Sequence, residues 1–203
     1  MCSVLMSVWG SRHPLSITKK PRSLKEVLEA RPVTEFVSVL ESARLADGAA
    51  AIIVASSEFL DQRLGPVGKG GNTGKTELSR RITIMGGGEG SGPFIPPSSI
   101  DETMFSCGTA AQKAYQEAQM SPNDINFFGL YDCFPVCLIR AIEAVGIAEK
   151  GQGGEYIEQI HRKYKETGKL EPEDFPINTH GGLLGFGAPW EVPAAYNIIE
   201  AVA

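Results

Sequence analysis

Cysteine and histidine side chains are the groups in this 203-residue chain best suited to nucleophilic or metal chemistry. The four cysteines are Cys2, Cys107, Cys133 and Cys137, and no two of them form a Cys-x-x-Cys pair. Only three histidines, at positions 13, 161 and 180, could join them as metal ligands, so the sequence predicts no bound metal. An ionised thiol could act as a nucleophile, but free cysteines of this kind more often pack as small apolar residues.

A glycine-rich stretch, NTHGGLLGFGAPWEVPAAYN, runs from Asn178 to Asn197 and is the second candidate for chemistry. It holds four glycines and two prolines and leads into an apolar segment suited to a helix. Because glycine lacks a side chain, such a stretch indicates backbone brought close to a ligand, a substrate or another loop. Tight packing of a turn on the following helix is the alternative interpretation.

The elements that would position these residues alternate between strands and helices. Apolar runs at 49–55 and 125–134 predict strands buried on both faces, and Ile82 and Ile84 alternate as in a third strand. Helices are predicted over 23–31 with a capping box of Ser23 and Glu26, around 110–118, over 135–146 and around 156–165. This alternation predicts an α/β fold, a mixed β-sheet with helices packed on its faces.

The segment 61–81 is rich in glycine, lysine and threonine and superficially resembles a phosphate-binding loop. Its spacing does not fit, because Lys69 stands where the first glycine of that motif is required and no predicted strand leads into the segment. We therefore interpret it as a solvated connecting loop, with a nucleotide-binding enzyme as a distant alternative.

Composition excludes several classes of protein. The formal net charge of -5 gives no electrostatic reason to expect nucleic acid or an anionic membrane as a partner. The opening residues do not form a secretory signal, and no apolar run approaches the ~20 residues of a membrane span. We expect an intracellular protein with reduced thiols, whose compartment (cytoplasm, mitochondrion or peroxisome) the sequence leaves open.

Three segments, in this order, resemble the thiolase superfamily, most closely its sterol-carrier-protein and lipid-transfer branch. They are SARLADGAAAIIVASSEF, SPNDINFFGLYDCFPVCLIRAIEAVGI and NTHGGLLGFGAP. The resemblance implies a two-lobed α/β fold of which this chain covers only part. Residues 1–60 would be the end of the N-terminal half, 61–81 the connecting loop, and 82–203 an incomplete C-terminal half.

The same resemblance implies that thiolase chemistry is missing from the matched segments. That chemistry needs a cysteine nucleophile, an activating histidine and a second, acid/base cysteine. The family histidine falls on Ala188, and neither family cysteine has a counterpart in the matched segments. Tyr131 takes the place of an Asn or His, and a tyrosine in a YDCF motif, as in steroid side-chain-cleaving aldolases, is a candidate acid/base. It could equally pack its ring and form a local hydrogen bond.

The remaining site residues are also assigned by resemblance. His180 could replace the missing base, or be an ordinary loop histidine with a hydrogen bond. Asp132 is expected to orient or cap a loop beside the substrate. Substrate binding is expected at Gly181, Gly182, Gly187 and Trp190, the last of which could line an acyl channel or simply pack against its neighbours.

The predicted function is a thiolase-like protein that acts on or binds acyl-CoA thioesters in lipid or sterol metabolism, with the thioester as substrate and no bound cofactor. A retro-aldolase using Tyr131 and a non-catalytic acyl-binding or scaffold subunit are the alternatives. Whether the chain is an enzyme stays open. A partial fold exposes apolar surface, so we expect a homodimer or a partner chain, of which a small OB-fold acyl-CoA-binding protein is one candidate.

Overall fold

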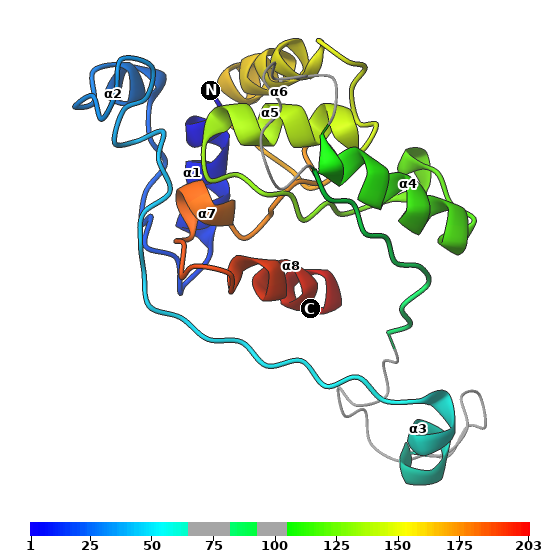
Figure 1. Ribbon diagram of the computed structural model, residues 1–203. Coiled ribbons are helices and arrows are strands. Elements are labelled where there is room, and N and C mark those ends of the chain that lie inside the picture. The colour runs from blue at the N-terminus through cyan, green and yellow to red at the C-terminus, as the bar shows by residue number, and fades with distance from the viewer. Residues whose placement is uncertain (65–81, 93–104) are drawn as a thin grey trace.

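A buried helix, α1 (Cys2–Arg12), lies at the centre of the molecule. The computed structural model of the chain describes residues 1–64, 82–92 and 105–203. Within these ranges α1 packs against α5 (Pro135–Ala144), α6 (Gly153–Thr167) and α7 (Gly182–Gly185). The first residues of the chain and the glycine-rich stretch near its end therefore share one core (Figure 1).

The sequence did not predict α1, and its composition explains why. All residues from Cys2 to Gly10 are buried, Ser3 and Ser7 among them, so over these residues the helix has no exposed polar face. A helix that is enclosed on every side needs no exposed polar face. Leu5 and Met6 of α1 pack in the main cluster with Leu138 and Ile142 of α5.

The predicted helices are confirmed. Ser23 and Glu26 form the expected capping box, with N···O distances of 2.7 and 3.1 Å, at the start of α2. The further helices of the described ranges are α2 (Leu24–Leu28), α3 (Ser57–Leu64), α4 (Ser106–Ala118), the short 3₁₀ helix η2 (Pro122–Asp124) and α8 (Pro193–Val202). In Figure 1, α3 lies apart from the core that the other helices build.

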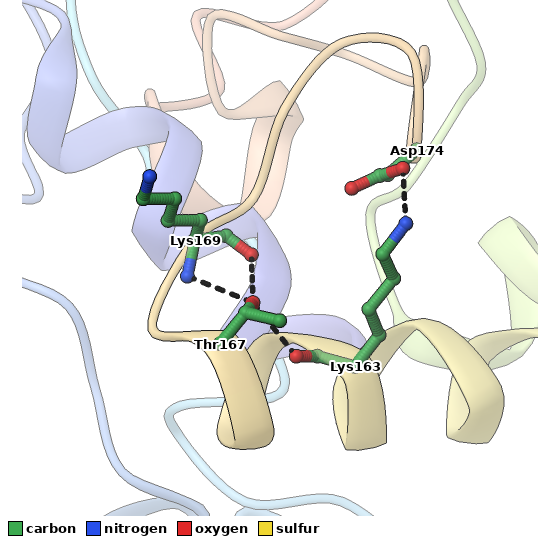
Figure 2. Close-up of polar contacts among 4 residues, drawn as sticks. All are labelled: Lys163, Thr167, Lys169 and Asp174. Carbon is green, nitrogen blue, oxygen red and sulfur yellow. Dashed lines mark hydrogen bonds and ion pairs between the residues drawn. The ribbon is translucent and has the colours of Figure 1, made fainter.

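Polar contacts hold the end of α6 against the chain that follows it. Lys163 forms an ion pair with Asp174, and the Thr167 hydroxyl donates to the Lys163 carbonyl at 2.9 Å and accepts from the Lys169 amide at 3.1 Å (Figure 2). Gly168 ends the helix with a φ of +69°, a left-handed conformation that glycine adopts without strain. The return of the chain from α6 to the core is thereby fixed.

The mixed β-sheet is not confirmed by the described residues. In place of strands they form isolated bridges, Pro32 with Ser38, Leu45 with Ala188, and Phe128 with Ile177. The predicted strands at 49–55 and 82–84 are irregular and mostly exposed, with Ile53 95% accessible. An apolar run becomes a buried strand only where neighbouring strands pair with it, and the described part of the chain offers these two runs no such neighbours.

The expected connecting loop, 61–81, is helical at its start, because α3 extends to Leu64. Its other residues, 65–81, lie outside the described ranges. Among the helices of those ranges, none combines the length and the apolar character needed to cross a membrane.

Candidate functional site

The YDCF and NTHGG segments lie side by side. Phe128 and Ile177 form a parallel bridge, and one residue further on the fully buried Asn178 continues the pairing with its side chain. Its Oδ1 accepts from the Leu130 amide and its Nδ2 donates to the Leu130 carbonyl, both at 2.8 Å. One side-chain amide thus takes the place of a strand neighbour for Leu130.

The first segment of the resemblance, which begins SARL, contacts the other two. The Ala43 amide donates to the Cys133 carbonyl at 2.9 Å, and the Ala188 amide donates to the Arg44 carbonyl at 2.9 Å. Leu45 and Ala188 form a parallel bridge. Residues 43–46 therefore join the YDCF and glycine-rich segments into one layer of irregular chain.

The Asp132 side chain lies inside this layer and holds the start of α7 in place. Its side chain is fully buried and accepts from the amides of Leu183 at 2.7 Å and Leu184 at 3.3 Å, at the start of α7. Burial raises the pKa of the Asp132 carboxyl to about 7, against the opposing effect of these hydrogen bonds. This agrees with an orienting role for Asp132, and the carboxyl lies away from solvent.

The glycines of the loop allow close packing within the protein. Gly182 has a φ of +60°, and a Cβ there would overlap the Asp132 carboxylate. Gly181 has a φ of +115°, and a Cβ there would lie 2.6 Å from the Gly10 Cα of α1. Gly187 faces Ala46, and all three are buried. They do not line either of the two cavities described below, and their predicted contact with substrate stays a prediction.

Tyr131 and Trp190 lie on the wall of one cavity of about 530 Å³. Its lining is mostly apolar and includes Phe127, Leu183, Pro193, Ile198 and Val202. Tyr131 is 61% exposed, and the interaction of its hydroxyl with Cys133, with burial second, raises its pKa. The Tyr131 hydroxyl therefore keeps its proton at neutral pH and can donate a hydrogen bond to a ligand in the cavity.

His180 lies elsewhere, in a second cavity of about 430 Å³ that is also lined by His13, Phe186, Tyr196 and Glu200. Its ring is 4% exposed, and burial lowers its pKa to about 4, with Glu200 opposing. Phe186 makes edge contacts with the rings of His180, His13 and Tyr196. Tyr131 and His180, both proposed from sequence as catalytic residues, thus line different cavities.

The cysteines are poorly placed for nucleophilic attack. Burial raises the pKa of Cys2 to about 11, and burial and Cys137 raise that of Cys133 to about 11. Burial also raises the pKa of Cys107. The Sγ atoms of Cys133 and Cys137 lie 3.5 Å apart as free thiols. Because the thiolate is the reactive form, these positions favour packing over catalysis.

Two residues of the site were not predicted. Asn178 belongs to the NTHGG motif, but its buried pairing with Leu130 has no local signal in the sequence. Glu191 lines the same cavity as Tyr131, and nothing in the sequence distinguishes it from a surface glutamate. Over the described ranges, no group of three or more His, Cys, Asp or Glu side chains could hold a metal ion.

The YDCF segment and the glycine-rich turn both lie in the part of the chain that a family model matches. The family model "Thiolase C-terminal domain-like" matches residues 98–203, and the chain belongs to this family. Within the superfamily it groups with the sterol-carrier-protein branch: sterol carrier protein 2 of Rattus norvegicus is 32% identical over 178 residues, covering 87% of this chain and 30% of the relative.

An acetyl-CoA acetyltransferase of Methanothermobacter thermautotrophicus is 26% identical over 203 residues. The match covers 100% of this chain and 48% of the acetyltransferase. Among solved structures, an Ltp2-ChsH2(DUF35) aldolase superposes with a TM-score of 0.75 at 22% identity, covering 99% of this chain and 48% of that one. A monomeric SCP2-thiolase like protein from Mycobacterium smegmatis gives a TM-score of 0.61 at 19% identity. The fold is therefore thiolase-like, and the chain spans about half or less of these relatives.

Proposed function

We propose that the chain binds an acyl-CoA thioester, with its acyl part in the cavity beside α8, and cleaves a β-hydroxyacyl-CoA by a retro-aldol reaction. The observation that carries this proposal is the apolar cavity of about 530 Å³ with the Tyr131 phenol on its wall. A volume of this size suits a small-molecule ligand. The apolar lining suits an acyl chain, and the phenol suits the oxygen of a thioester.

The chemistry available in this cavity favours cleavage over acyl transfer. Acyl transfer through the enzyme needs an ionisable thiol, whereas the pKa of Cys133 is raised to about 11 and Ala188 carries no titratable group. Retro-aldol cleavage needs no covalent intermediate. It needs removal of the hydroxyl proton and a hydrogen bond to the enolate oxygen, and a protonated Tyr131 can supply that hydrogen bond.

The second candidate is a non-catalytic acyl-binding subunit, which the same apolar lining favours. Purified chain incubated with a 3-hydroxyacyl-CoA separates the two. We expect release of a ketone or aldehyde and a shorter acyl-CoA, with turnover reduced about 10²-fold or more in Tyr131→Phe, in the range of a lost electrophilic donor. Saturable binding without turnover, unchanged in Tyr131→Phe, would support the binding subunit instead.

The proposal also includes a partner chain that binds this one. The name of the aldolase with the similar fold joins two components, and the exposed run around Ile53 gives this chain apolar surface to cover. We propose a small OB-fold acyl-CoA-binding protein or a second copy of the chain as that partner. Purification at low salt, followed by mass determination of the intact complex, would identify either of them.

A further inference from the structure

The proposed cleavage needs a base that removes the proton of the substrate hydroxyl, and the roles given so far assign no residue to this step. The contact with Cys133 raises the pKa of Tyr131, so its hydroxyl keeps its proton near neutral pH. A protonated phenol donates a hydrogen bond and does not accept the proton of a substrate hydroxyl. His180 lines the other cavity, behind Phe186. The base must therefore come from another side chain on the wall that Tyr131 shares.

Glu191 is on that wall. Among the described residues lining the cavity of Tyr131, only Tyr131 and Glu191 carry ionisable side chains. The two are close enough for the negative charge of Glu191 to be one of the influences on the Tyr131 hydroxyl. Glu191 itself is exposed, so a ligand entering from solvent would reach its carboxylate without displacing packed side chains.

The backbone before Glu191 has an uncommon conformation. Trp190 has a φ of +51° and remains 79% exposed. A bulky residue in the left-handed region costs about 1–3 kcal/mol and is often retained at a functional site. Residues 190–192 form the turn that precedes Pro193 at the start of α8. This turn places Trp190 and Glu191 together at the cavity, which Tyr131 also lines.

We infer that Glu191 is the catalytic base of the reaction proposed above, an inference that rests on the proposed function. Its carboxylate removes the β-hydroxyl proton, the C–O bond becomes a carbonyl, and the Cα–Cβ bond breaks. The bonding pair moves to Cα as a thioester enolate, whose oxygen accepts a hydrogen bond from Tyr131. The proton held by Glu191 then returns to Cα. The products are a ketone or aldehyde and a shorter acyl-CoA, and no oxidant or co-reactant is required.

The test compares Glu191→Gln, Tyr131→Phe and the control Glu166→Gln, an exposed carboxylate on α6, all in the full chain with a 3-hydroxyacyl-CoA. We expect Glu191→Gln to lower kcat about 10²–10⁴-fold, the usual size of a lost general base, with the dissociation constant nearly unchanged. The acidic limb of the kcat/KM profile should disappear in this variant. Glu166→Gln should match the wild type, and circular dichroism should show all variants folded.

The outcomes separate this inference from the function on which it rests. Turnover that is lost in Tyr131→Phe but kept in Glu191→Gln would overturn the role of Glu191 and leave the retro-aldol function standing. A wild-type chain that binds the thioester without cleaving it would overturn both. An acidic limb that persists in Glu191→Gln would also overturn the inference, even where kcat falls, because the titrating base would then be another group.

Discussion

At the scale of single residues, the site depends on two buried polar side chains that never reach the cavity. Asp132 holds the start of α7, and Asn178 holds the backbone of Leu130. Tyr131 lies between the positions that these two fix, so its direction is determined by residues without a chemical role of their own. Changes at Asp132 and Asn178 should therefore lower stability and disturb Tyr131 together.

Replacing Asp132 tests the first of these positions. Asp132→Ala leaves the Leu183 and Leu184 amides without their acceptor, and buried unpaired amides cost about 1–3 kcal/mol each. We expect the free energy of unfolding in urea to fall by roughly 2–6 kcal/mol on these grounds. Asp132→Asn keeps one acceptor oxygen, enough for one of the two amides, and should lose about half as much. Equal losses in both variants would contradict the capping role.

The same carboxyl gives a pH dependence of stability. Its pKa is raised to about 7 in the native state, against about 3.9 in an unfolded chain. Between these values the native state holds a proton that the unfolded state has released, so stability falls as pH rises from about 4 to about 7 and then levels off. Asp132→Asn is neutral throughout and should lack this component, which urea titrations of both proteins across the range would measure. Parallel pH profiles would contradict it.

The second buried polar side chain, Asn178, gives a stability prediction parallel to that for Asp132. Asn178→Ala removes a donor and an acceptor, each 2.8 Å from a buried Leu130 backbone atom. At about 1–3 kcal/mol for each of the two unpaired groups, the free energy of unfolding should fall by roughly 2–6 kcal/mol. Asn123→Ala at an exposed position is the control and should change it by less than about 0.5 kcal/mol. A similar small effect at both positions would show that the Leu130 backbone is satisfied by other groups.

The sequence indicated part of this arrangement. The order of the three segments placed Tyr131 and Asp132 near the glycine-rich turn, and the contacts of Asp132 with α7 bear out that neighbourhood. The separation of His180 from Tyr131 into different cavities could not be predicted. Which side of a loop a side chain faces depends on its packing neighbours, here Phe186, whose ring also contacts His13 from the other end of the chain.

At the scale of elements, the contact of α1 with α7 depends on glycine. A Cβ at Gly185 would clash with the Met6 carbonyl of α1, whereas a Cβ at Gly154 in the first turn of α6 meets nothing within 4 Å. We expect Gly185→Ala to lower the melting temperature, with a loss of about 1–3 kcal/mol from overpacking. Gly154→Ala should leave stability equal or raise it by up to about 1 kcal/mol. A neutral Gly185→Ala would mean that α7 can move away from α1 without loss.

Local signals explain which elements could be predicted. The capping box of Ser23 and Glu26 and the proline start of α5 act within a few residues, and α2 and α5 form where the sequence placed them. The strand predictions at 49–55 and 82–84 were wrong because pairing depends on partners elsewhere in the chain. Helix α1 was missed because a helix buried on all sides has no charged, exposed stripe to mark it.

At the scale of the whole molecule, the chain carries more apolar surface than its core covers. Ile53 and Val54 are 95% and 73% exposed, and Ile84 is 74% exposed. We expect exposed apolar side chains of this kind to be covered in a contact with a partner or with another part of a longer protein. The division of the chain at 61–81 into two thiolase-like parts stays a prediction, and residues 49–55 lie on the N-terminal side of it.

Self-association is the prediction that follows at this scale. Sedimentation velocity over a wide range of protein concentration should show the chain forming dimers or larger species, because burial of the 51–54 run removes apolar area from water at about 25 cal/mol per Å². The double variant Ile53→Lys and Val54→Lys should shift the chain toward the monomer, since a buried lysine must lose its hydration. Glu58→Lys, on α3 nearby, adds the same charge outside the run and should leave association nearly unchanged. A chain that stays monomeric at every concentration, like the relative described as monomeric, would show that the run does not drive self-association.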